Sequence, residues 1–332
     1  MKRRDLIGTA IGAAWLAAAP GALAAVAAPT RTGFVQDDRF LQPVFRPSHP
    51  EQPARVRVIV EALRNDGLLD RLVSVAPLPA TEIDAALRLI HTEAHIAAIA
   101  GEYGAAIDGV ARTGVGAVLA AVTGVMNGSL RNAFVCSRPP GHHASNTGRE
   151  EGFCFYNNIA IAARYAQRHF GIERVLIVDW DYHHGNGTEA FFYDDPGVLY
   201  FSTHDWAAYP GTGDPQRRGE GPGLGYNINV PLRCRSTDDD IVGAFETQLL
   251  PAAERFQPEL VLISAGFDSR VDDLLGCFAV TDAGFVRLTR LVMGIARRHS
   301  GGRLVSMLEG GYNLSGLASA AVAHVRTLAG GD

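Results

Sequence analysis

Five short, strongly apolar segments of this 332-residue chain are each followed by a polar or glycine-rich turn. They are residues 133–137, 174–181, 198–204, 260–268 and 303–312. Such runs predict strands buried on both faces, and helix-like segments lie between them. We expect helices at Asn158–Phe170, closed by Gly171, and at Asp282–His299, with Thr281 as N-cap. The alternation predicts an α/β domain of three layers, α/β/α, around a mainly parallel sheet.

The polar turns carry the chemically useful side chains. Along the chain they read RPPGHHA, DWDYHHGNG, STHDW, AGFDS and EGGYN. Because the strands of a parallel sheet end on the same edge, these turns should converge, and ligand crevices of open α/β sheets form there. The sequence therefore predicts one site at the carboxyl ends of the strands.

The second turn contains candidate metal ligands. Asp179, Asp181 and His183 alternate at a spacing of two, so in an extended segment their side chains share one face. Asp181 and His183 can bind one ion, and Asp268 can supply a third ligand from a neighbouring strand. Two carboxylates and an imidazole suit Zn²⁺ or Fe²⁺ and leave positions open, as catalytic sites do. The alternative is a plain hydrogen-bonded turn.

Two adjacent histidines, His142 and His143, are candidates for the general base and acid. Asp179 can accept a ring N–H from one of them, and Asn186 from the other. A carboxylate partner raises the pKa of an imidazole more than an amide does, so one histidine could stay protonated while the other acts as base. Tyr312, after two glycines, could donate to a developing oxyanion, although a core tyrosine is the simpler interpretation.

Together these residues describe metal-assisted hydrolysis of an amide, and their motifs resemble a known family. RPPGHHA, EGFCFYNN, VDWDYHHGNGT, SAGFDS and LEGGYN, in this order, closely resemble the histone deacetylase family. The likeness is to class II and to the bacterial deacetylase-like amidohydrolases, relatives of the acetylpolyamine amidohydrolases. It implies the arginase/deacetylase fold and zinc-dependent hydrolysis of N-acetyl amines, either acetyl-lysine or small acetylated amines.

The resemblance implies a role for each residue. The implied metal ligands are Asp181, His183 and Asp268. The implied dyad is His142 and His143, with His143 the better candidate for the base, and Tyr312 is the oxyanion donor. The residues implied to line the substrate tunnel are Gly152, Phe153, Tyr209 and Leu275. A structural cation, usually K⁺, is implied at Asp179, Asp181, His183 and Ser202, and a second at Phe192, Asp195, Val198 and Tyr226.

Two positions depart from the family's usual pattern, and a third bears on substrate choice. Tyr209 replaces the second tunnel phenylalanine, and Leu274 replaces the proline of the rim loop. Leu275 is apolar where the polyamine-selective branch has an acidic residue, which argues mildly against strict polyamine specificity. Two other functions remain as alternatives: a two-manganese ureohydrolase of the same broad fold, and a catalytically silent protein that binds acetylated amines.

Composition narrows the choice further. The formal net charge is −5 without a basic stripe, so we expect no nucleic-acid partner. The only lysine is Lys2, which excludes Schiff-base and phosphate-loop lysine chemistry. The four cysteines show no CxxC spacing, and buried free thiols are favoured over disulfides. The sequence leaves a homo-oligomer open.

The first residues predict an export signal. A cationic start, an apolar stretch over residues 6–19 and a small-residue site after Ala24 indicate a signal peptide at residues 1–24. The deacetylase-like domain would then span residues 25–332, with no membrane anchor after cleavage. Arg3 and Arg4 favour the twin-arginine route to the periplasm, and the general secretory route is the alternative.

Replacing both arginines tests the route. Arg3→Lys with Arg4→Lys should leave the precursor in the cytoplasm, because the twin-arginine pathway requires the arginine pair. Fractionation and immunoblotting measure this. An unchanged periplasmic yield would point to the general secretory route.

Overall fold

The computed structural model describes residues 31–330, so the predicted signal peptide lies outside the described residues. The strands are β1 (Thr32–Val35), β2 (Val73–Val75), β3 (Asn132–Val135), β4 (Val175–Asp179), β5 (Val198–Asp205), β6 (Asn227–Leu232), β7 (Leu260–Ala265) and β8 (Leu304–Leu308). The α-helices are α1 (Ala54–Asn65), α2 (Ala80–Leu87), α3 (Glu93–Met126), α4 (Asn158–Phe170), α5 (Asn186–Phe192), α6 (Asp238–Ala244), α7 (Leu250–Phe256), α8 (Asp282–His299) and α9 (Leu314–Leu328). A π-helix at Phe245–Leu249 joins α6 to α7.

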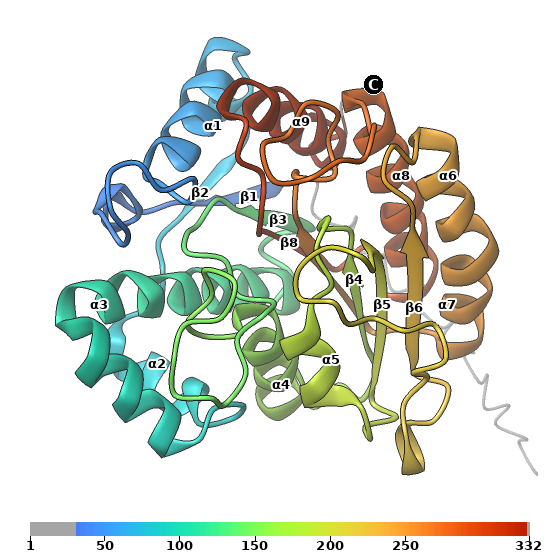
Figure 1. Cartoon of the computed structure of the whole chain (residues 1–332), viewed down its shortest axis with the longest axis horizontal. Helices are drawn as coiled ribbons and strands as arrows, with labels where there is room; N and C mark the ends of the chain where they lie inside the picture. Colours follow the sequence, from blue (N-terminus) through green and yellow to red (C-terminus); the bar gives the residue numbers. More distant parts are fainter. Residues whose placement is uncertain (1–30, 331–332) are drawn as a thin grey trace, which may run out of the picture.

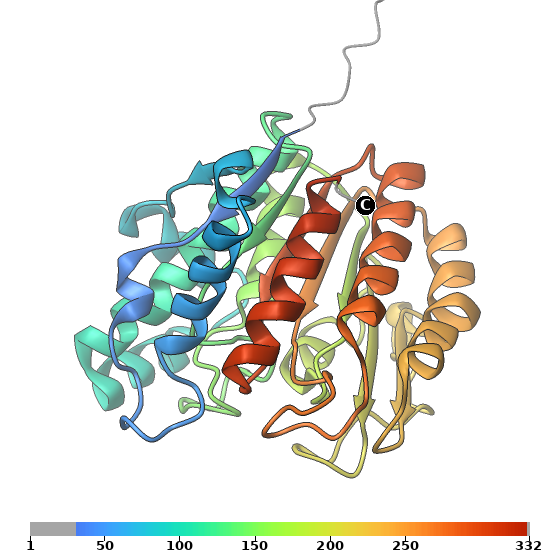
Figure 2. The same cartoon turned by 90° about the horizontal axis from the view of Figure 1, so that it is seen from above.

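The strands form one eight-stranded sheet in the order β2-β1-β3-β8-β7-β4-β5-β6, and every neighbouring pair is parallel. Helices α1, α9, α8, α6 and α7 cover one face, and α2, α3, α4 and α5 cover the other (Figures 1 and 2). Strands β3, β4, β5, β7 and β8 are buried along their whole length. The predicted three-layer fold with a parallel sheet is confirmed.

Both helices delimited from the sequence have the predicted bounds. Helix α4 ends at Gly171, whose φ of 67° is the left-handed conformation that terminates helices. Helix α8 begins after Thr281, whose side chain accepts a hydrogen bond from the Gly284 backbone. The strands were predicted less well. Strand β4 ends at Asp179 and β8 at Leu308, earlier than predicted, because the polar residues that follow leave the ladder and turn into the site.

Helix α3 is long and apolar enough to cross a membrane by length and composition alone. However, 72% of its apolar window is buried inside the protein. It packs against α4 and against strands β1, β3 and β8 of the sheet. Its non-helical Gly104 (φ 78°) divides the described helix into two segments. These contacts are those of a core helix.

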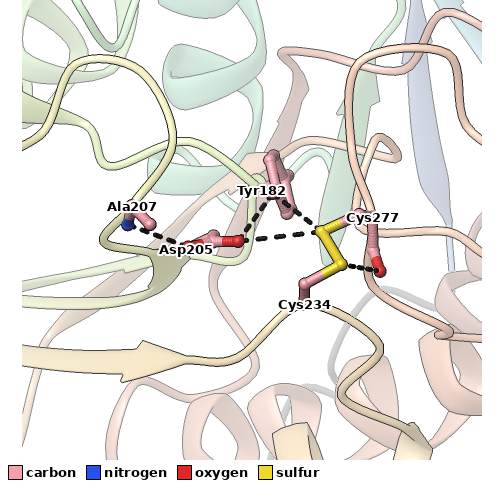
Figure 3. Close-up of a disulfide and its surroundings, with 5 residues drawn as sticks. All are labelled: Tyr182, Asp205, Ala207, Cys234 and Cys277. Carbon is pink, nitrogen blue, oxygen red and sulfur yellow. Dashed lines mark hydrogen bonds between the residues drawn. A yellow bond between two sulfur atoms is a disulfide. The ribbon is translucent and has the colours of Figure 1, made fainter.

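The expectation of four free thiols is wrong for one pair. Cys234 and Cys277 form a disulfide across 43 residues of sequence, with Cα atoms 5.1 Å apart (Figure 3). Cys136 and Cys154 are free and buried, as predicted. No local pattern predicts this pairing, because the fold and not local spacing brings the segment after β6 beside the loop that precedes α8.

A fully buried ion cluster ties the N-terminal segment to the end of β8. Arg138 donates to both carboxylate oxygens of Glu51, at 2.7 and 2.5 Å, and to the backbone carbonyl of Gln42 at 2.7 Å. Arg55 also contacts Glu51 at 3.4 Å, and it donates to the carbonyl of Gly311 at 2.7 Å. One carboxylate therefore compensates two guanidinium groups that lie out of water.

Removing that carboxylate's charge should destabilise the protein strongly. Glu51→Gln leaves both buried guanidinium groups without a counter-charge, which typically costs about 3–5 kcal/mol of unfolding free energy. Urea denaturation measures the loss. Glu254→Gln is the matched control, because Glu254 pairs with Arg298 at the surface and its loss should change stability little. Equal stability of the two variants would contradict the role of the buried cluster.

Candidate active site

The three predicted metal ligands converge on one point. Asp181 and His183 follow β4, and Asp268 follows β7, the strand that pairs with β4. His183 Nδ1 lies 3.2 Å from Asp181 Oδ1 and 3.1 Å from Asp268 Oδ2. Asp181 to His183 form a bend and not the extended segment expected from the sequence. The bend nevertheless keeps both side chains on the same side.

Backbone groups hold the two carboxylates in place. Gly310 N donates to Asp181 Oδ2 at 2.8 Å, and Tyr182 N donates to Asp268 Oδ1 at 2.9 Å. Glycine is required around them, because a Cβ at Gly266 would collide with the Asp181 carboxylate and one at Gly310 with that of Asp268. The backbone thus forms a close cradle around the ligand set.

This ligand set fits a divalent cation. Both carboxylates are fully buried, and burial together with the charge of Asp181 raises the pKa of Asp268 to about 7. Two adjacent buried carboxylates repel each other, and a bound dication would remove that cost. Among residues 31–330, Asp181, His183 and Asp268 are the one group of three or more such side chains with suitably placed ligand atoms. Their oxygens and imidazole nitrogen match the preferences of Zn²⁺ and Fe²⁺.

The two histidines of the PGHHA turn lie beside the ligands with different partners. His142 Nδ1 is 3.0 Å from Asp179 Oδ2, and His143 Nδ1 is 2.8 Å from Asn186 Oδ1. Although burial opposes its charged form, the carboxylates of Asp181 and Asp179 raise the pKa of His142 to about 10. Burial and the charge of His142 lower the pKa of His143 well below its ordinary value. The surroundings therefore favour the charged form of His142 and the neutral form of His143.

Glu309 supports this turn, and sequence reasoning gave it no role. Its Oε2 accepts hydrogen bonds from Gly141 N at 2.7 Å and His142 N at 3.3 Å, and Ser264 donates to its Oε1 at 3.1 Å. Burial raises the pKa of Glu309 to about 7. Its position directly after a buried strand could have predicted a supporting role, because a buried acidic residue needs hydrogen-bond donors.

A cavity of about 440 Å³ opens beside the ligands. Its lining includes all four predicted tunnel residues, Gly152, Phe153, Tyr209 and Leu275, together with the site residues His143, His183 and Tyr312. Tyr209 and Leu275 are 50% and 40% exposed, which places them at the mouth. The sequence missed Glu150, Tyr182 and Ala208. Glu150 accepts a hydrogen bond from the backbone of Phe153, whose φ is 72°.

Tyr312 is almost fully buried and lines the same cavity. Its backbone N–H donates to Asp273 Oδ2 at 2.7 Å, and the Arg55 guanidinium lies 5.0 Å from its ring centroid. Phe153 packs edge-on against the ring at 5.8 Å. Burial raises the pKa of Tyr312 well above its ordinary value, so the phenol stays protonated and can donate a hydrogen bond.

The residues proposed for structural cations divide into two groups. Asp179 and Ser202 are direct partners in the β4–β5 register, next to the metal ligands. In the second group, the Asp195 side chain pairs with Arg164 and accepts from Gly197 N at 2.7 Å. The other three members are Phe192 at the end of α5, Val198 at the start of β5 and Tyr226 before β6. A cation in the second group would therefore rely on backbone carbonyls.

The sequence matches known deacetylases. The histone deacetylase domain model matches residues 49–328. The chain is 40% identical over 309 residues to histone deacetylase 6 of Caenorhabditis elegans, covering 85% of this chain and 32% of that protein. It is 36% identical over 299 residues to a probable deacetylase of Archaeoglobus fulgidus, covering 86% and 82%. It is 38% identical over 306 residues to the polyamine deacetylase HDAC10 of Danio rerio, covering 84% and 44%.

The fold matches as well. The crystal structure of the HDA15 HD domain superposes with a TM-score of 0.83 at 36% identity, covering 91% of this chain and 89% of that one. The chain spans 32%, 45% and 58% of the length of three curated relatives, all histone deacetylases, so it corresponds to one part of them. By the extent of the domain match, this chain belongs to the histone deacetylase family.

Proposed function

We propose that the protein hydrolyses the N-acetyl amide bond of acetylated amines, with a zinc ion held by Asp181, His183 and Asp268. The observation that carries the proposal is the position of these ligands. His183 lines the same cavity as His143 and Tyr312, and Asp181 and Asp268 contact His183. A base, an electrophilic centre and an oxyanion donor would therefore face one substrate carbonyl. The relatives named deacetylases support this reaction class.

A divalent ion in this ligand set would act as a Lewis acid that polarises the amide carbonyl and activates water. The same donors also suit Fe²⁺, and elemental analysis of the purified protein distinguishes the two metals. A two-manganese ureohydrolase would need further Asp and His ligands. No second such group occurs among residues 31–330, which leaves the deacetylase proposal better supported.

The two histidines have separate tasks in this proposal. His143 is held neutral, and its Nδ1 is occupied by Asn186, so Nε2 is the nitrogen that accepts the proton of the attacking water. The same proton then passes to the leaving amine nitrogen. His142, kept protonated by Asp179, contributes positive charge that stabilises the negative charge developing on the substrate. Tyr312 donates its phenolic hydrogen to the carbonyl oxygen as that charge forms.

The lining of the cavity supports the proposal of a linear acyl-amine substrate. Its walls are largely aromatic, from Phe153, Tyr182 and Tyr209, and a lysine or polyamine methylene chain would pack between such rings. Glu150 adds one acidic group to the lining, which favours a cationic remainder on the substrate.

Export to the periplasm, which we also propose, would favour small acetylated amines or envelope substrates over cytoplasmic acetyl-proteins. A K⁺ ion at Asp179 and Ser202 would offset the negative charge under the site.

Removing one ligand should remove metal and activity together. Asp268→Ala leaves two protein ligands, and we expect loss of bound zinc with a fall in activity of at least about 10²-fold. Inductively coupled plasma mass spectrometry and a deacetylation assay measure both. Asp239→Ala, which alters an exposed carboxylate on α6, should change neither. Full zinc occupancy in Asp268→Ala would overturn the ligand assignment.

Tyr312→Phe separates the oxyanion donor from the metal ligands. The ring is kept, so fold and zinc content should be unchanged, whereas kcat should fall by about 10²–10³-fold, the usual effect of losing one oxyanion donor. KM should change little, because the hydrogen bond strengthens only as charge develops. Tyr209→Phe is the matched control, since Tyr209 is half-exposed at the mouth and loss of its hydroxyl should leave kcat unaffected. Near wild-type kcat in Tyr312→Phe would return this residue to a packing role.

A further inference from the structure

The Cys234–Cys277 disulfide joins two loops at the carboxyl ends of the strands, the end of the sheet at which the site lies (Figure 3). Cys234 follows β6, the edge strand, and Cys277 lies in the loop between β7 and α8. Two backbone hydrogen bonds run parallel to the disulfide: Arg235 N donates to Cys277 O at 2.7 Å, and Ala279 N donates to Ser236 O at 2.8 Å. The disulfide and these two hydrogen bonds together fix the β7–α8 loop to the segment after β6.

The sulfur of Cys277 contacts a residue of the substrate cavity. Tyr182 Oη lies 3.1 Å from Cys277 Sγ and donates to Asp205 Oδ2 at 2.7 Å, as Figure 3 shows. The Tyr182 ring lines the cavity and packs perpendicular to the imidazole of His183, with centroids 5.0 Å apart. Its backbone N–H holds Asp268. A change at the disulfide thus reaches the cavity wall through one side chain.

The same loop carries part of the cavity mouth. Leu275, two residues before Cys277, lines the cavity and is 40% exposed. Gly276 packs so closely on the carbonyl of Asp268 that a Cβ would collide with it. Asp273 accepts hydrogen bonds from Leu275 N at 2.9 Å and from Tyr312 N at 2.7 Å. The hydrogen bonds of Asp273 hold the start of this loop, and the disulfide with its two neighbouring backbone hydrogen bonds holds its end.

We propose that Cys234–Cys277 is a reversible thiol–disulfide site that positions the cavity mouth and thereby sets substrate affinity, an inference that rests on the proposed deacetylase function. Its co-reactant would be a small thiol or dithiol. A dithiol breaks the S–S bond by exchange, its two thiol hydrogens end on Cys234 and Cys277, and the two electrons come from the dithiol, which becomes a disulfide. Export would favour the oxidised form.

Two features make this site selective. Cys234 is exposed, so a thiolate can reach the bond, whereas the free cysteines Cys136 and Cys154 are fully buried. Burial also raises the pKa of Cys136 to about 12 and that of Cys154 well above its ordinary value, so neither forms the thiolate that exchange requires. Reduction and reoxidation would therefore act on the one pair next to the cavity.

The test compares the oxidised and reduced mature protein. A phosphine is the reductant, because dithiols bind zinc; it is oxidised to the phosphine oxide with oxygen from water, and both sulfurs become thiols. We expect KM for an acetylated amine to rise by about tenfold, with kcat and zinc content unchanged. Tenfold is the smaller of the effects that the loss of one methylene-sized contact has in an apolar pocket. Non-reducing tryptic mapping should show the residue 234–235 dipeptide linked to peptide 271–287 only before reduction.

Cys234→Ser is the control variant, because it breaks the bond while keeping the Cys277 sulfur beside Tyr182. It should show the raised KM without phosphine and no further change with it. Unchanged KM in both the reduced protein and the variant would overturn the proposal, as would joint loss of kcat and zinc, which would mark a general structural role.

A second readout does not need catalysis. If the loops separate on reduction, tryptic cleavage after the exposed Arg233 and Arg235 should accelerate. Redox-dependent cleavage in a protein that deacetylates no substrate would contradict the proposed function and keep the redox site. If the protein is an active deacetylase but neither its cleavage rate nor its KM depends on the redox state, the proposed function stands and the redox site is contradicted.

Discussion

The structure is organised around negative charge buried at one edge of a parallel sheet. Asp179, Asp181, Asp268 and Glu309 are all fully buried, and each follows or ends a central strand. Because unpaired buried carboxylates are costly, each has defined donors. Asp179 is paired with His142 and Tyr200, and Glu309 accepts two backbone N–H groups from the histidine turn. The carboxylates beside His183 retain an excess of charge that a divalent cation would balance.

That constraint explains which parts of the site were predictable. Asp181, His183, Asp268 and the two histidines stand in short motifs directly after buried strands, and parallel pairing alone brings such turns together. Their partners Asp179 and Asn186 were predictable for the same reason. Geometry within one turn, by contrast, was predicted only roughly, since the ligands lie in a bend and not in an extended strand.

The remaining features depend on contacts between distant segments, which local patterns do not encode. The disulfide joins residues 43 positions apart, and Glu51 meets Arg138 across 87 positions. Strands β1, β2 and β6 lie in the edge regions of the sheet and lack the continuous apolar runs of the central five. Glu150 was missed because its carboxylate caps the backbone of Phe153 locally, a role that any surface glutamate could have had.

The site therefore has two levels of support with different physical origins. The reacting groups are held by the sheet itself, through β4, β7 and β8 and the backbone N–H groups of their turns, so a change at the surface should not disturb them. The mouth is held by a loop whose far end is fixed near the edge strand by one disulfide and two backbone hydrogen bonds. Chemistry and substrate access can for this reason vary separately. In the proposed mechanism, a change that shifts the mouth would alter which amines enter, while the proposed proton transfer between His143 and the substrate would keep its geometry.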